Sequence, residues 1–244
     1  MSLINKVSKI LNNPKEIEDI SYLPNKISYD DDLSILDIDL KKIIPKPPKN
    51  TSITTKKELE QLAQLTKNKT RKELDLIMAV DEDPLDLFRN FFDAKKLNFP
   101  HGVFEEYFNV MEQYVYALKY YYNRARPEQL APYFNLDIDV LYTDTHHTAS
   151  YPSGHTMYSE LAAYIASEEL PEYKNKFFEL SRYCGLARIL QGVHYPSDNE
   201  ASRIAVKKLY PLIKEYVKMN KPEPIRRPLT EKPQESKEPK KRPL

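Results

Sequence analysis

A histidine in the last third of the chain is followed four residues later by an aspartate. His194 and Asp198 lie in the segment Arg188-Ile-Leu-Gln-Gly-Val-His194-Tyr-Pro-Ser-Asp198. If a helix begins near Pro196, the carboxylate can accept a hydrogen bond from Nδ1–H of the imidazole, which leaves a lone pair on Nε2. Such an imidazole is a candidate nucleophile toward phosphorus, and the planar guanidinium of Arg188 suits phosphoryl oxygens. A loop histidine followed by an ordinary helix-start aspartate explains this segment equally well when it is taken alone.

A second segment, Pro152-Ser153-Gly154-His155, is typical of a turn that leads into a helix. The free N–H groups at a helix start, the Ser153 hydroxyl and the positive end of the helix dipole together favour an anion. His155 at its edge is placed to protonate a leaving oxygen. A plain serine N-cap beside an incidental histidine is the alternative, and it is favoured when this segment stands alone.

Two cations precede these segments. Lys119 and Arg126 are seven residues apart and are followed by Pro127. On a helix this spacing is nearly two turns, which puts both side chains on one face and predicts an oxyanion clamp. A solvated basic face is the commoner meaning of such a pair.

The elements that must position these residues are predicted to be helices. Leucines recur at helical spacing after Thr54-Thr55, and Asp83-Pro84 is typical of an N-cap followed by a proline in the first turn. The sequence predicts an all-α bundle with roughly six core helices. Helices are expected from Thr54, over 72–80, from Asp83-Pro84 through Phe92, and over 102–125, 154–170, 172–190 and 197–219, with a long connection over 128–153.

The chain divides into three predicted regions. Residues 1–50 are polar and broken by prolines, and we expect a partly ordered arm. Residues 51–219 form the helical domain, with the candidate residues inside 119–198. Residues 220–244 are rich in Pro, Lys and Glu and are predicted to be a disordered tail.

Taken together and in this order, the three segments resemble the signatures of the type 2 phosphatidic acid phosphatase superfamily. That family includes class A bacterial nonspecific acid phosphatases, integral-membrane lipid phosphatases and vanadium haloperoxidases, and its motifs are K-x6-R-P, P-S-G-H and S-R-x5-H-x3-D. The resemblance covers about residues 80–218. One position departs, because Ala187 stands where the family usually has serine.

The resemblance implies an acid phosphatase/vanadium haloperoxidase-like bundle in which the three segments meet at one phosphate pocket. It implies His194 as the nucleophile, Asp198 as the group that orients it, and His155 as general acid and then general base. Three fixed cations would replace the usual metal ion, so no metal or other cofactor is expected. The phosphate-binding groups implied by the resemblance are Lys119, Arg126, Arg188, Ser153 and the Gly154 N–H.

The function expected from this resemblance is metal-independent hydrolysis of phosphate monoesters through a phosphohistidine, with a bell-shaped pH profile on the acidic side of neutrality. One alternative is a vanadium-dependent haloperoxidase with vanadate in the same pocket, although such relatives are generally much longer. Another is a lipid phosphate phosphatase acting at a membrane surface, with Ile4, Val7, Ile10 and Leu11 on one face of an N-terminal helix. A binding-only relative without turnover is the non-enzyme alternative.

Composition restricts the partners and the compartment. The formal net charge is +1, so nothing in the charge balance calls for nucleic acid, and a small phosphorylated substrate is the expected partner. The sequence shows no secretory signal and no apolar run long enough to span a bilayer, so we expect a soluble cytoplasmic or otherwise intracellular protein. The single cysteine, Cys184, permits no intrachain disulfide. The sequence does not predict the oligomeric state.

Two further clusters are assigned no catalytic role. His146-His147 with Asp144 has no convincing third ligand for a metal ion, although it is close enough to Ser153 in sequence to rim the pocket. Asp81, Glu82 and Asp83 are interpreted as turn and N-cap acids.

Overall fold

The computed structural model describes residues 14–23, 36, 38–39 and 42–220. The residues Ile4, Val7, Ile10 and Leu11 of the membrane-surface alternative lie outside the described residues. So does the predicted tail after Asn220.

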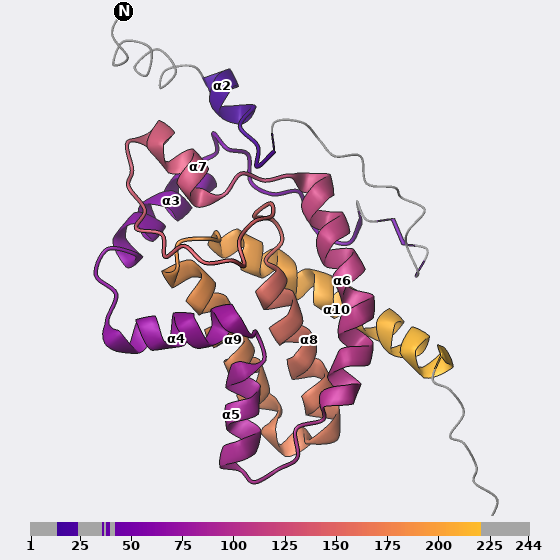
Figure 1. The fold of residues 1–244 in the computed structure, drawn as a ribbon. Helices are drawn as coiled ribbons and strands as arrows, with labels where there is room; N and C mark the ends of the chain where they lie inside the picture. The colour runs from indigo at the N-terminus through magenta and orange to yellow at the C-terminus, as the bar shows by residue number, and fades with distance from the viewer. Residues whose placement is uncertain (1–13, 24–35, 37, 40–41, 221–244) are drawn as a thin grey trace, which may run out of the picture.

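The described part of the chain is all-α, which confirms the predicted fold class (Figure 1). It holds no β-strand, only an isolated bridge between Ser21 and Arg124. The helices are α2 (Pro14–Glu18), α3 (Ile53–Leu65), α4 (Arg71–Glu82), α5 (Asp86–Ala94), α6 (His101–Tyr122), α7 (Pro127–Leu130), η3 (Ala131–Phe134), α8 (Gly154–Glu169), η4 (Pro171–Tyr173), α9 (Lys174–Leu190) and α10 (Pro196–Asn220).

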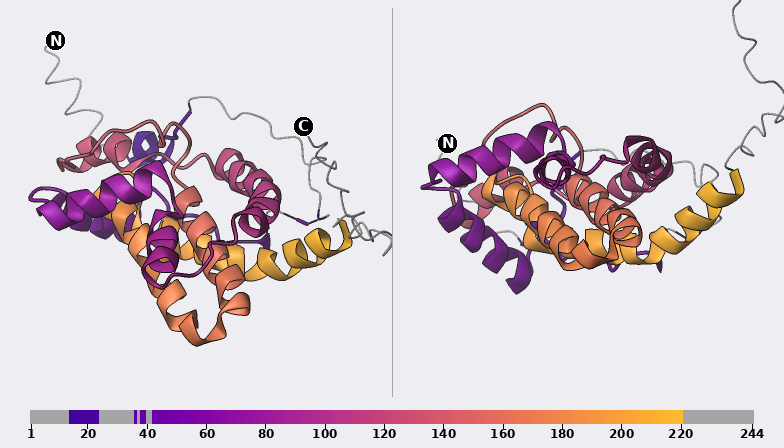
Figure 2. Two further views of the ribbon diagram at one scale, coloured as in Figure 1. Left: turned by 60° about the horizontal axis from the view of Figure 1, so that its bottom comes forward. Right: turned by 90° about the horizontal axis from the view of Figure 1, so that it is seen from below.

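The centre of the bundle is the pair α8 and α9, with α10 packed against α8 and α4 packed against α9. Small residues on α8 let the helices approach closely, since Ala162, Ala163 and Ala166 are fully buried there. Helix α6 packs against both α8 and α10. Seen from below, α5 and α6 lie on the same side of α8 (Figure 2).

Aromatic packing fixes α5 against α9. The rings of Phe91 and Phe177 meet edge to face at 5.2 Å, and Phe88 and Phe92 both stack on Phe177. Phe88, Phe92 and Phe177 are at most 2% exposed. These contacts hold the junction of α4 and α5 close to the start of α8, where the predicted site residues lie.

Two predicted helix boundaries are wrong. Helix α6 ends at Tyr122 and not at 125, because Asn123 adopts a left-handed conformation with φ 46°. Helix α5 begins at Asp86 and not at Pro84. Asp83 ends α4, and its carboxylate accepts a hydrogen bond from the Leu85 N–H instead of capping the first turn of α5.

The long connection after α6 is also more ordered than predicted. It contains the two short helices α7 and η3 before it crosses the top of the bundle. Arg126 stands immediately before α7 in extended backbone, with φ −70° and ψ 158°.

Candidate active site

His194 lies in the loop between α9 and α10, and two neighbours fix its protonation. Its Nδ1 is 3.0 Å from Oδ2 of Asp198, which is fully buried. Its Nε2 is 3.1 Å from Nη1 of Arg126. A guanidinium only donates hydrogen bonds, so Nε2 must be the acceptor and Nδ1 must carry the proton given to Asp198. The imidazole therefore holds its lone pair on the nitrogen opposite the carboxylate.

Asp198 is held by more than the histidine. Its Oδ2 also accepts hydrogen bonds from Ser150 Oγ at 2.6 Å and from the Tyr195 N–H at 2.9 Å. Its Oδ1 accepts from Nη1 of Arg124 at 2.6 Å. These contacts fix the carboxylate in one orientation at the start of α10, and they keep His194 in one tautomer.

Arg124 belongs to a buried ion cluster that sequence reasoning missed. Its Nη2 donates to Oε2 of Glu58 in α3 at 3.2 Å, and its guanidinium lies 3.8 Å from the centre of the Tyr195 ring. Glu58 in turn accepts from the Ser197 backbone and hydroxyl. The arginine stands two residues before Arg126, so its role could not be separated from that of its neighbour by spacing alone.

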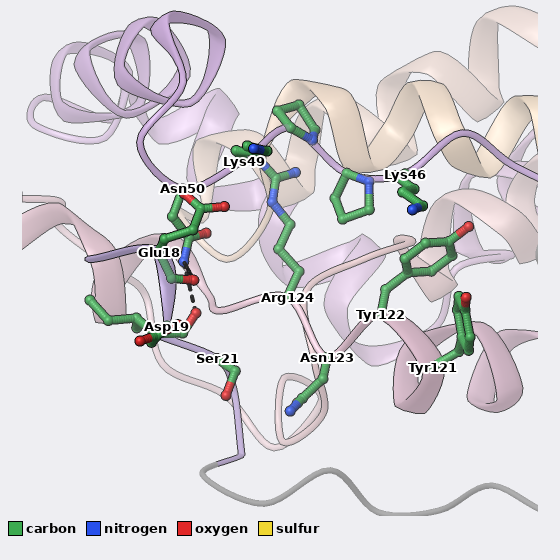
Figure 3. Close-up of a pocket in the computed structure, with 13 residues that line it drawn as sticks. Glu18, Asp19, Ser21, Lys46, Lys49, Asn50, Tyr121, Tyr122, Asn123 and Arg124 are labelled. Atoms are coloured by element: carbon green, nitrogen blue, oxygen red, sulfur yellow. Dashed lines mark hydrogen bonds between the residues drawn. The ribbon is translucent and has the colours of Figure 1, made fainter. Parts of the chain in front are cut away.

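Arg124 also borders a cavity of about 460 Å³, formed by the end of α6 and residues 18–21 and 46–50. Figure 3 shows its side chain extending from the end of α6 toward Lys49. None of the predicted site residues lines this cavity.

The start of α8 is built as the segment Pro152–His155 predicts. Ser153 is the N-cap, fully buried, and its hydroxyl accepts from the Thr156 N–H and the Thr156 hydroxyl. A Cβ at Gly154 would lie 3.2 Å from Val115 Cγ1, so the absence of a side chain lets α8 begin against α6. Lys119 stands on α6 beside this start.

Lys119 and Arg126 come together, but not for the predicted reason. Arg126 lies outside α6, so the two cations do not share a helix face. They converge because both bind the loop that leads to α8: Lys119 Nζ donates to the Ala149 carbonyl at 2.6 Å, and Arg126 Nε donates to the Thr148 carbonyl at 2.8 Å.

Arg188 has a carboxylate partner that the sequence interpretation assigned differently. Its Nη1 donates to Asp81 of α4, and its Nη2 donates to the Thr145 hydroxyl at 3.1 Å. Asp81 also accepts from Gln191 Nε2 at 3.1 Å. The interpretation of Asp81 as a turn or cap acid is wrong, because it lies in α4 and is 7% exposed. Its position four residues after the buried Ile77, on the apolar face of α4, was the available signal.

Five of the predicted residues line one cavity of about 390 Å³: Lys119, Arg126, Gly154, His155 and His194. His147 also lines it, and His146 stacks on His147. Ser153 is buried beneath it, and Arg188 is turned toward Asp81 and does not line it. Among the described residues, no group of three or more His, Cys, Asp or Glu side chains is arranged to hold a metal ion.

Burial and the positive charges around this cavity lower the pKa of both histidines. Burial, followed by the charges of Arg126 and Lys119, holds the pKa of His194 well below its ordinary value. Burial, followed by the charge of Arg188, lowers the pKa of His155 to about 3. Burial also lowers the pKa of Arg126 to about 10. The cavity is therefore cationic with neutral imidazoles, and an anion bound there would oppose these shifts.

For Asp81, burial alone would raise the pKa, but the hydrogen bonds from Thr145 and Arg188 and the charge of Arg188 outweigh it. Together they lower the pKa of Asp81 to about 2. The carboxylate is consequently ionised, and it holds the guanidinium of Arg188 in one position beside Thr145, which lines the cavity. Asp81 also places its backbone carbonyl 3.3 Å from Nε2 of His155, so the end of α4 contacts two predicted site residues.

Comparison with known proteins identifies the same region. The profile of the PAP2 superfamily matches residues 107–206. Non-specific acid phosphatases are among the similar proteins: the one from Salmonella typhi is 36% identical over 90 residues, and the one from Providencia stuartii is 40% identical over 55 residues. The first match covers 36% of this chain and 34% of the relative, and the second covers 22% of each. The chain thus spans about a third or less of the length of these relatives.

No helix in the described part of the chain is long and apolar enough to cross a bilayer.

The resemblance drawn from the three motifs is confirmed, and the matched residues include both histidines and all three cations of the predicted site. Over residues 107–206 and in its all-α fold, this chain is similar to the PAP2 superfamily, and it is also similar to the non-specific acid phosphatases.

Proposed function

We propose that this protein hydrolyses phosphate monoesters through a phosphohistidine formed on His194, without a metal ion. The observation that carries the proposal is the fixed tautomer of His194, with Asp198 on Nδ1 and an unprotonated Nε2 beside the cationic cavity. Similarity to proteins named non-specific acid phosphatases supports the same reaction class.

In the first step, Nε2 of His194 attacks phosphorus, a P–N bond forms, and the P–O bond to the alcohol breaks. Arg126 now donates to Nε2, and it would transfer that hydrogen bond to a phosphoryl oxygen as the substrate binds. Lys119 lies on the same cavity and adds positive charge toward the phosphoryl group. Arg188 does not line the cavity and adds positive charge from behind it; its Nε–H is buried with no partner among the described residues.

His155 is the proposed proton donor to the departing alcohol oxygen and lines the same cavity. In the empty site its pKa is about 3, so it is neutral there at ordinary pH. A phosphoryl dianion beside it raises that pKa, so the complex takes up the proton that the alcohol needs. In the second step, neutral His155 removes a proton from water, the water oxygen bonds to phosphorus, and the P–N bond breaks.

Hydrolysis of a chromogenic aryl phosphate from pH 4 to 8, in the presence of EDTA, tests this reaction. We expect EDTA-resistant turnover that orthovanadate inhibits and that His194→Ala abolishes. The variant His155→Ala should retain phosphoryl transfer to a reduced extent, with a loss of about 10²–10⁴-fold. Alkaline denaturation after mixing with a radiolabelled aryl phosphate should trap label on the protein in His155→Ala and none in His194→Ala.

The variant Asp198→Asn tests the tautomer directly. An asparagine can donate to Nδ1, which would put the imidazole proton on Nε2 and remove the lone pair from the cavity. Turnover should fall while circular dichroism keeps its helical signal. Label trapped in His194→Ala, or full activity in Asp198→Asn, would contradict the histidine nucleophile.

A further inference from the structure

One stripe of α6 runs past the candidate active site and continues toward the start of the helix. Val115, Tyr116 and Lys119 line the cavity of about 390 Å³ that holds His194. One to four turns earlier, Phe104, Phe108 and Glu112 are among the residues that line a second cavity, of about 430 Å³. Residues three and four apart share a helix face, so both cavities open on the same side of α6.

Tyr158 joins the two cavities, because its side chain lines both. It stands on α8 one turn after His155, and its ring lies 5.0 Å from the ring of Phe108. The second cavity is closed on its other side by residues 83–85 and Arg89, at the junction of α4 and α5. In the view from below, α5 and α6 lie on the same side of α8 (Figure 2).

The lining of the second cavity combines aromatic rings with uncompensated negative charge. Phe104 is buried, and Phe108 and Tyr158 are half-buried, so their faces offer apolar contact area. Glu105 and Glu112 are exposed there, and neither forms an ion pair with another described residue. The charge of Arg89 is already matched, since its Nε donates to Asp83 at 3.0 Å.

The two cavities together, here called the trough, have a cationic end at Lys119 and Arg126. Their other end, at Glu112 and Phe108, is acidic and aromatic. We propose that the second cavity binds the alcohol part of the substrate, and that it selects an uncharged or cationic aromatic group against one with a second negative charge. This proposal rests on the proposed phosphatase function. Only if the phosphoryl group binds beside His194 does the alcohol part of the substrate extend into the second cavity.

Non-hydrolysable phosphonates separate this proposal from catalysis. Equilibrium binding to the full chain is measured by calorimetry for methylphosphonate, phenylphosphonate, 4-carboxyphenylphosphonate and 4-(aminomethyl)phenylphosphonate. We expect phenylphosphonate to bind more tightly than methylphosphonate, the aminomethyl compound to bind at least as tightly, and the carboxylate to bind more weakly. Each unpaired glutamate should contribute about a two- to fivefold discrimination against the added carboxylate.

Two variants assign the effect to this cavity. Glu105→Gln/Glu112→Gln should remove the discrimination against the carboxylate, and the control Glu172→Gln, in η4 away from the trough, should not. Phe108→Ala, at a residue that lines only the second cavity, should weaken phenylphosphonate by about tenfold while leaving methylphosphonate unchanged.

The outcomes are distinguishable from a failure of catalysis. Selective phosphonate binding without turnover of any monoester would keep the subsite and overturn the hydrolase proposal. Equal affinity for the four compounds, or an equal loss for methylphosphonate and phenylphosphonate in Phe108→Ala, would overturn the subsite even if the protein is an active phosphatase.

Discussion

Replacing Arg124 by methionine removes the guanidinium that pairs with two buried carboxylates. The side chains of Arg124, Glu58 and Asp198 are 2%, 8% and 0% exposed, and the two ion pairs measure 3.2 and 2.6 Å. Methionine keeps the length and much of the apolar contact on the Tyr195 ring, so the charge is the main loss.

The expected cost follows from what each carboxylate retains. Asp198 Oδ1 loses its hydrogen bond from Arg124, whereas Oδ2 keeps donors from Ser150, His194 and the Tyr195 backbone. Glu58 keeps only its contacts with Ser197. Removing one partner of a buried ion pair costs about 3–5 kcal/mol, a large fraction of the roughly 5–15 kcal/mol that stabilises a typical domain.

Urea unfolding followed by circular dichroism measures this loss. With a slope near 2 kcal/mol per molar urea, the midpoint of Arg124→Met should fall by about 1.5–2.5 M. Arg71→Met removes an arginine whose side chain is 87% exposed and paired four residues along the helix with Asp75, and it should shift the midpoint little. A loss in Arg124→Met as small as in Arg71→Met would refute the claim that this cluster is a buried charge network.

The pH dependence gives an independent check. Burial already raises the pKa of Glu58, while Arg124 opposes that rise. Without Arg124 the folded-state pKa rises further above the unfolded value, so the folded state binds more protons and the stability deficit should shrink as pH falls from 7 toward 5. Adding Glu58→Gln to Arg124→Met should recover part of the loss at pH 7 and remove this pH trend.

Three further predictions concern the site. Asp81→Asn should lower the thermal midpoint at pH 7, and the deficit should fade as pH drops through the Asp81 pKa of about 2, where the native carboxylate is also neutral. Sulfate, which remains a dianion, should bind more tightly at pH 5 than at pH 8, because the anion raises the depressed pKa of His155. Calorimetry should also detect proton uptake on binding. A sulfate affinity that is independent of pH would contradict this. Gly192→Ala should lower the free energy of unfolding in urea by about 1–2 kcal/mol, because Gly192 has φ 86° and an added Cβ would lie 3.0 Å from Ile138. Gly102→Ala is the control, since a Cβ added there would meet no other atom within 4 Å.

Short spacings in the sequence were enough to predict the local parts of this structure. The contact between His194 and Asp198 spans four residues, and Ser153 caps the helix that it begins, so local backbone geometry is enough to predict both. The helical class followed from apolar periodicity in the same way. The division at residues 50 and 219 and the chemical roles of the site residues remain predictions.

The contacts that support the site are long-range, and the sequence did not predict them. Lys119 and Arg126 converge through the carbonyls of residues 148–149, which lie more than twenty residues away, and a left-handed Asn123 separates them from a common helix face. Asp81 reaches Arg188 across 107 residues, and Glu58 reaches Ser197 across 139. The apolar face of α4 indicates that Asp81 is buried, but no spacing in the sequence indicates which cation pairs with a buried carboxylate, because the fold brings that cation from a distant part of the chain.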